Sequence, residues 1–220
     1  MKNSEINKLA IFESIDRLIS NPNFSLNLGQ TWYENNKYHI FNNVVLKAPL
    51  KDLISLKVYL AVVAILSPAN SWNSNQWDAN ILVLRFFGID EAKGYKYRTY
   101  STNVAKAELL LKRVYLQHWN EQNAIETALN IPTSLKTWNF YNNLLDPKNN
   151  NFVTIDRHIL RIMGFETKSI SPQNYNVLKD IFIEYWAVRQ FNFSVSSLQA
   201  ILWVNYLVIE NKKVELEAGF

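Results

Sequence analysis

The sequence predicts an all-α fold of about eight or nine helices, and three observations support this prediction. Hydrophobic residues make up 48% of the 220 residues, which is enough for a sizeable core. Apolar residues recur at spacings of three and four along most of the chain, as they do on one face of a helix. The 5 glycines and 6 prolines leave few turns. Since no repeat, linker or charged tail divides the chain, we expect one domain over residues 1–220.

Four helices are expected in the first half of the chain, over about residues 4–20, 49–66, 74–87 and 104–114. We expect Ser4 to cap the first of them, ahead of a face of isoleucines and leucines. Residues 24–49 are aromatic and irregular, with an extended piece expected over 38–46. Pro49 and Asp52 open the second helix, which is strongly apolar.

Five further helices are expected over about residues 121–129 and 134–145, from about 156 and 172, and over 196–210. Asp156 begins a helix that Gly164 ends. Ser171 and Pro172 begin the next, because serine caps a helix and proline is tolerated in its first turn. The last helix is apolar on nearly every side, so we expect it at the centre of the fold.

The composition excludes several classes of chemistry. With no cysteine, the chain has no disulfide, thiolate nucleophile, iron–sulfur cluster or cysteine zinc site. The 3 histidines are scattered, so we expect no metal. We also expect no cofactor, because the chemistry indicated by the segments described below needs only water or an amine. The N-terminus has no secretory signal, and the longest apolar run, Val58–Leu66, is too short to span a bilayer. We therefore expect a soluble, cytoplasmic protein with no membrane partner.

The charge balance suits a polyanionic partner. The net charge is +4, which is compatible with nucleic-acid binding without being diagnostic of it. One stretch interleaves three basic residues with three tyrosines: Lys93, Lys96 and Arg98 with Tyr95, Tyr97 and Tyr100. Such a stretch either follows a DNA backbone or is a solvated loop. Both interpretations stay open from the sequence.

Three separated segments carry the chemistry, and their order is informative. Ala64–Trp72 follows the apolar helix, Ile131–Lys136 leads into the helix that contains Tyr141, and Phe152–His158 opens a later helix. This order resembles the helix-hairpin-helix base-excision DNA glycosylases over about residues 55–165. In that family a hairpin ending in lysine is followed, some twenty residues later, by the catalytic aspartate. Lys136 and Asp156 are 20 positions apart.

The resemblance extends to small glycosylase-like proteins of phages and bacteria, through residues 140–143, 153–158 and 198–203. The hairpin departs from the family pattern. It keeps Pro132 and Lys136, but it has none of the glycines that allow close approach to a phosphate. Helix N–H groups and the hydroxyl of Thr133 or Ser134 are the remaining candidates for holding that phosphate.

The resemblance implies a role for each candidate residue. Asp156 would stabilise the positive charge that develops on the sugar when the N-glycosidic bond breaks, and would orient water or activate an amine. Lys136 would be a Schiff-base nucleophile. Asn70 and Trp72 would fill the space of a flipped base. The further candidates for contacting DNA are Thr133, Ser134, Tyr141 and His158.

Each of these residues also has a structural interpretation. Asp156 could instead cap a helix, Lys136 could lie on a solvated helix surface, and Tyr141 could belong to the core. The sequence thus predicts a DNA glycosylase that excises a damaged or modified base flipped out of double-stranded DNA, and leaves an AP-lyase activity open. A glycosylase-fold protein that binds DNA without cutting it is the alternative, and a helical protein–protein module is a third possibility.

Overall fold

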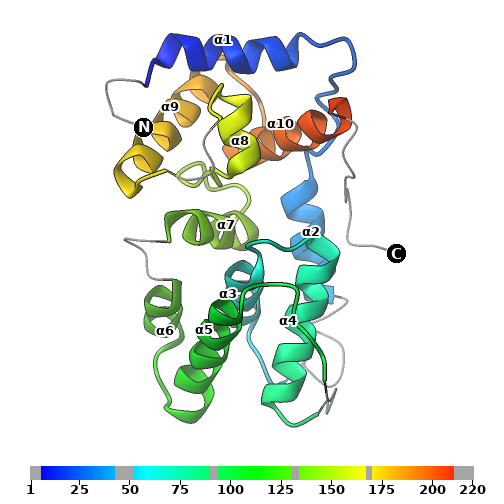
Figure 1. Cartoon of the computed structure of the whole chain (residues 1–220), viewed down its shortest axis with the longest axis vertical. Coiled ribbons are helices and arrows are strands. Elements are labelled where there is room, and N and C mark those ends of the chain that lie inside the picture. Colours follow the sequence, from blue (N-terminus) through cyan, green and yellow to red (C-terminus); the bar gives the residue numbers. More distant parts are fainter. Residues whose placement is uncertain (1–5, 43–51, 90–93, 130–133, 167–169, 211–220) are drawn as a thin grey trace. The chain divides into compact units, whose positions relative to one another are not determined.

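The computed structural model describes residues 6–42, 52–89, 94–129, 134–166 and 170–210. These residues form ten α-helices and no strand, so the predicted all-α class is confirmed. The helices, labelled in Figure 1, are α1 Lys8–Ile19, α2 Trp32–Ile40, α3 Leu56–Leu66, α4 Trp72–Phe86, α5 Ser101–Leu111, α6 Glu121–Leu129, α7 Leu135–Leu145, α8 Arg157–Ile162, α9 Pro172–Val188 and α10 Val195–Ile209. A π-helical turn, η3 Lys112–Leu116, continues α5.

The described residues pack as two compact units. Unit 1 contains the chain up to Glu34 and from Asp146 onward, and unit 2 contains Asn35–Leu145. Described residues before position 35 and after position 145 therefore contribute to the same unit, while those between form the other. Helix α2 begins in unit 1 and ends in unit 2. The single domain expected over residues 1–220 stays a prediction, and each unit is described by itself.

Helix α3 is the central helix of unit 2. It packs against α4, α5, α6 and α7, and all nine residues of Val58–Leu66 are buried. A helix covered on every side needs an apolar residue at nearly every position, which explains its continuous hydrophobic sequence. The Ser55 hydroxyl caps α3 by accepting a hydrogen bond from the Val58 N–H at 3.3 Å.

Helix α10 is the central helix of unit 1, as its sequence predicts. It packs against α1, α8 and α9. Its fully buried Asn205 holds the loop after α1, because its Oδ1 accepts from the Ser25 N–H at 2.8 Å and its Nδ2 donates to the Ser25 carbonyl at 2.9 Å. Gly29, in the same loop, has φ +88°, and a Cβ there would lie 2.9 Å from the Ala200 carbonyl oxygen. Only glycine fits this approach.

The structure corrects several predicted elements. Residues 32–40 form α2 where an extended piece was expected from position 38, because the buried residues Trp32, Tyr33, Asn36 and Ile40 recur at helical spacing. Helix α3 begins at Leu56, not at Pro49 or Asp52, since Ser55 supplies the cap. Asn7 caps α1 by accepting from two backbone N–H groups, whereas the expected cap, Ser4, lies outside the described residues.

Candidate functional site

Asp156 is the N-cap of α8, at the position that the sequence predicts. Its Oδ1 accepts hydrogen bonds from the backbone N–H groups of His158 and Ile159, both at 2.9 Å. Its backbone is extended, with φ −103° and ψ −178°. Among the described residues, no group donates a hydrogen bond to Oδ2. The carboxylate is therefore held at the cap through one oxygen.

The segment before Asp156 is fixed by a buried tyrosine from α9. The Tyr175 hydroxyl accepts from the Ile155 N–H at 3.0 Å and donates to the Val153 carbonyl at 2.8 Å. Val153, Thr154 and Ile155 are all buried. Burial also raises the pKa of Tyr175 far above its ordinary value, so the hydroxyl stays protonated and continues to donate.

A second tyrosine approaches the same segment from α2. The Tyr33 hydroxyl donates to Gln199 Oε1 on α10 at 2.5 Å and lies 3.5 Å from the Thr154 hydroxyl. All three side chains belong to unit 1 and are buried. Buried polar networks of this kind fix a backbone in one arrangement when every group is satisfied. The direction in which Asp156 points thus depends on two elements distant in sequence.

His158 lies in the first turn of α8, in the same unit as Asp156. Its ring is partly buried and packs at a tilt against Tyr206 of α10, with ring centroids 6.0 Å apart. Arg157 Nε donates to His158 Nε2 at 3.3 Å. His158 therefore joins α8 to α10 beside the cap, and its contact with DNA stays a prediction.

Asn70 and Trp72 lie in unit 2, around the start of α4. Asn70 Nδ2 donates to Asp78 Oδ2 at 2.8 Å. The Trp72 ring is buried, its Nε1 donates to Asn36 Oδ1 at 2.5 Å, and its ring packs edge-on against Phe140 at 6.2 Å. Both side chains have structural partners here, so filling the space of a flipped base would require them to exchange these contacts.

The hairpin residues also belong to unit 2. Ser134 precedes α7, and its carbonyl accepts the Trp138 N–H at 3.0 Å. Lys136 is exposed in the first turn of α7. Thr133 lies outside the described residues. Asp156 belongs to unit 1, so the two residues expected to carry the chemistry come from different units.

Tyr141 is in the core of unit 2, with 1% of its surface exposed. Its ring packs against Trp138, one turn earlier on α7, at 5.8 Å. No described residue forms a hydrogen bond with its hydroxyl. Burial, with smaller contributions from the charges of Glu121 and Glu126, raises the pKa of Tyr141 to about 12. Its expected contact with DNA stays a prediction.

One polar cluster was not predicted from the sequence. Asp78 of α4 is fully buried and accepts three hydrogen bonds, from Asn70 Nδ2 at 2.8 Å, the Tyr95 hydroxyl at 2.5 Å and the Arg98 N–H at 2.9 Å. It thereby ties the basic and aromatic connection before α5 to the turn before α4. The signal in the sequence was a carboxylate on the apolar face of a helix, because such a group must be paired inside the protein. Lys93 of the predicted basic cluster lies outside the described residues.

No helix in the described ranges of the chain combines the length and apolar character needed to cross a membrane. Nor do three or more metal-binding side chains gather anywhere in the same ranges.

Comparison with known proteins gives one match. No curated protein and no solved structure matches the chain. A family model described as a family of unknown function, DUF7178, matches residues 20–213 and so includes helices of both units. The chain belongs to the DUF7178 family, whose function is unknown.

Proposed function

We propose that this protein is a DNA glycosylase that removes a damaged or modified base by hydrolysing its N-glycosidic bond, with Asp156 as the catalytic carboxylate. The observation that carries the proposal is the different hydrogen bonding of the two carboxylate oxygens of Asp156. Oδ1 is anchored by two backbone N–H groups, while Oδ2 accepts no hydrogen bond from the described residues. Capping a helix does not require the preceding backbone to be held in place. The segment before Asp156 is nevertheless fixed by two hydrogen bonds of the Tyr175 hydroxyl.

The chemistry needs a fixed negative charge beside the sugar. As the bond between C1′ and the base nitrogen breaks, its electron pair leaves with the base and positive charge develops on the sugar ring. A carboxylate close to that charge stabilises the transition state. Water then attacks C1′ and loses a proton to Asp156 Oδ2, which acts as the general base. The departing nucleobase takes a proton from solvent. No cofactor takes part in this sequence.

The order of the three segments supports DNA as the substrate. The segments around Asn70, Lys136 and Asp156 occur in the order of the helix-hairpin-helix glycosylases, and the net charge of +4 favours a polyanion. The base must leave the stack to reach a carboxylate at a helix cap. We therefore propose a base flipped out of double-stranded DNA as the reacting group.

The test is mass spectrometry of bases released from a panel of damaged, modified and hypermodified DNAs. We expect Asp156→Asn to lower release by ~10²- to 10⁴-fold, because it removes the charge. Asparagine is also a good cap, so the free energy of unfolding should fall by less than about 1 kcal/mol.

A matched control is Asp146→Asn. Asp146 is an exposed aspartate of the same unit, whose Oδ1 accepts the Lys148 N–H at 3.3 Å. Release should be unchanged in this variant. Parental release by Asp156→Asn would remove Asp156 from the chemistry. Binding of DNA without release from any member of the panel would instead favour the role of a DNA-binding protein that does not cut.

A further inference from the structure

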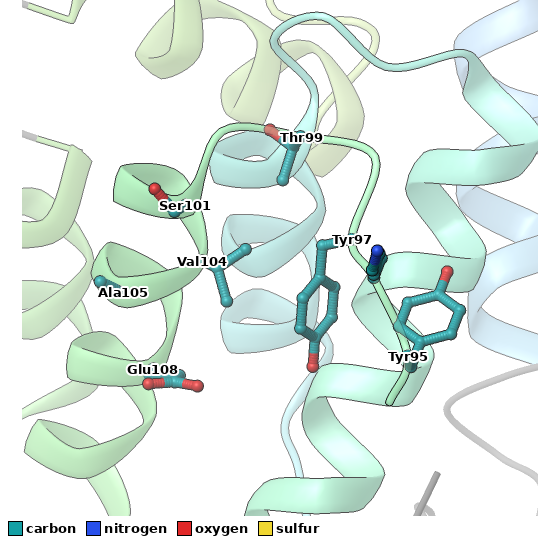
Figure 2. Close-up of a pocket in the computed structure, with 8 residues that line it drawn as sticks. Tyr95, Tyr97, Thr99, Ser101, Val104, Ala105 and Glu108 are labelled. Atoms are coloured by element: carbon teal, nitrogen blue, oxygen red, sulfur yellow. The ribbon is translucent and has the colours of Figure 1, made fainter. Parts of the chain in front are cut away.

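A hollow in unit 2 carries an inference about how nucleic acid is held. It lies between the connection that precedes α5 and the first two turns of that helix (Figure 2), and its volume is about 340 Å³. This is near the lower end of the volumes of small-molecule pockets, which start at about 300 Å³. The hollow is open to solvent on one side. It therefore has room for one small planar group that remains attached to a chain outside.

The aromatic wall of the hollow is held rigidly. The rings of Tyr95 and Tyr97 meet edge-to-face with centroids 5.2 Å apart, and Arg85 Cζ lies 5.7 Å from the centroid of each. Arg85 Nη1 also donates to the Tyr97 hydroxyl at 3.3 Å, and the Tyr95 hydroxyl donates to Asp78. Rings fixed in this way lose little conformational freedom when a ligand stacks on them.

The opposite wall is the side of α5. Val104 supplies apolar surface facing the ring of Tyr97, which extends alongside the helix in Figure 2. A slot between an aromatic ring and aliphatic carbon suits a flat heteroaromatic ring, because both surfaces gain contact area without needing a specific hydrogen bond.

The two ends of the hollow differ in electrostatic potential. Ser101 lies at the end where α5 begins without a side-chain cap, and the helix dipole adds positive potential there; Lys96 also lines the hollow. Lys96 is exposed and pairs with no carboxylate among the described residues. Glu108 lies two turns farther along α5, at about 10 Å from Ser101 by the helical rise of 1.5 Å per residue.

We propose that this hollow binds one unstacked nucleotide of a single-stranded segment of nucleic acid. The base stacks on Tyr97, the phosphate lies at Lys96 and Ser101, and Glu108 accepts from an exocyclic amino group of the base. A base inside a duplex is covered on both faces, so it cannot enter a slot of this kind. The identity of the partner rests on the proposed function, but this binding does not involve Asp156.

Fluorescence anisotropy with the full chain tests the site, using three labelled single-stranded octamers: oligo-dC, oligo-dT and an abasic strand with the same backbone. We expect the wild type to prefer oligo-dC to the abasic strand. Tyr97→Leu should weaken oligo-dC binding by ~10-fold and leave the abasic strand unchanged, since only stacking is lost. Tyr97→Phe loses the hydrogen bond from Arg85 but keeps the ring, so it should bind oligo-dC more tightly than Tyr97→Leu does.

Charge variants test the two ends of the hollow. Lys96→Gln should reduce the slope of log affinity against log salt by about 0.7, as expected for one phosphate contact to a single strand, and Lys57→Gln, an exposed lysine at the start of α3, should leave it unchanged. Glu108→Gln should abolish the preference for oligo-dC over oligo-dT.

Equal wild-type affinity for oligo-dC and the abasic strand would overturn the site, as would an unchanged ratio in Tyr97→Leu. Free dCMP that binds as tightly as oligo-dC would overturn the assignment to a strand. The two proposals fail separately. Asp156→Asn should bind oligo-dC normally. Parental base release by Asp156→Asn together with an intact Tyr97 effect would make the catalytic assignment wrong, whereas lost base release without any Tyr97 effect would make this binding site wrong.

Discussion

The hydroxyl of Tyr175 lies 3.0 Å from the backbone nitrogen of Ile155, the residue immediately before Asp156, and accepts its N–H. The same hydroxyl donates to the Val153 carbonyl at 2.8 Å. A single buried side chain on α9 thus satisfies two backbone groups of an extended segment, and the described part of the chain contains no strand that could pair with it. These two hydrogen bonds fix the backbone immediately before Asp156, the proposed catalytic residue.

Tyr175→Phe should therefore weaken both folding and base release. Losing the hydroxyl removes the acceptor of the buried Ile155 N–H and one donor to the Val153 carbonyl, which costs about 1–3 kcal/mol of unfolding free energy. We expect kcat to fall by ~10-fold with KM nearly unchanged, because Tyr175 positions Asp156 and touches no DNA. Urea unfolding and steady-state base release measure the two effects.

The matched control is Tyr185→Phe on the same helix. The Tyr185 hydroxyl donates to Asp16 Oδ1 at 2.6 Å and has no contact with the segment before Asp156. It should lower stability and leave kcat at the parental value. Equal kcat losses in both variants would reduce Tyr175 to a general contributor to folding.

Tyr141→Phe should act in the opposite direction. The Tyr141 hydroxyl is buried and forms no hydrogen bond with the described residues, so folding pays for its dehydration without compensation. Removing it should raise the free energy of unfolding by about 1 kcal/mol, which a shift of the urea midpoint will show. A loss of DNA affinity in the same variant would support the predicted contact of Tyr141 with DNA, and a loss of stability would mean that the hydroxyl has a partner.

Alkaline pH should weaken the contact between Tyr95 and Asp78. Burial, with the hydrogen bond to Asp78 second, raises the pKa of Tyr95 from 10.0 to about 12. Because the folded state retains the proton longer than the unfolded state, the stability from this group is complete below about pH 10 and is lost as the pH rises through about 12. Tyr95→Phe lacks this titration.

Urea unfolding of the wild type and Tyr95→Phe at several pH values checks this expectation. The wild type should be more stable at neutral pH, and the difference should shrink between about pH 10 and 12. A difference that stays constant over this range would show that the Tyr95 hydroxyl titrates alike in the folded and unfolded states.

Lys136→Gln separates water from an amine as the nucleophile. Lys136 is exposed in the first turn of α7, whereas nucleophilic lysines are activated by a desolvated pocket or a neighbouring cation. We therefore expect the wild type to leave an intact abasic strand and to give no adduct with DNA on borohydride reduction. As a phosphate contact, Lys136 should contribute about 0.9 to the salt slope of duplex binding, which Lys136→Gln removes. A trapped adduct that Lys136→Gln abolishes would establish the Schiff-base route instead.

Local pattern was enough to predict the all-α class, the caps at Asp156 and Ser171, and the central position of α10. Each of these depends on residues within a few positions of one another. A cap acts on the next three N–H groups, and a helix that is apolar on every side must be covered whatever covers it. Helix α2 was missed because aromatic residues favour extended structure locally, and only burial of one helical face against the core reverses that preference.

The arrangement around the candidate sites was decided by tertiary structure. Tyr175 reaches Ile155 across 20 positions, Tyr33 reaches Gln199 across 166, and Arg98 reaches Asp78 across 20. No local periodicity records such pairs, because a buried hydroxyl or carboxylate takes whichever partner the packed helices bring within hydrogen-bond distance. The sequence by itself determined that Asp156 would cap a helix. Only the packing of α2, α9 and α10 determined which side chains fix the segment before Asp156, because a buried polar group bonds to whichever partner folding places beside it.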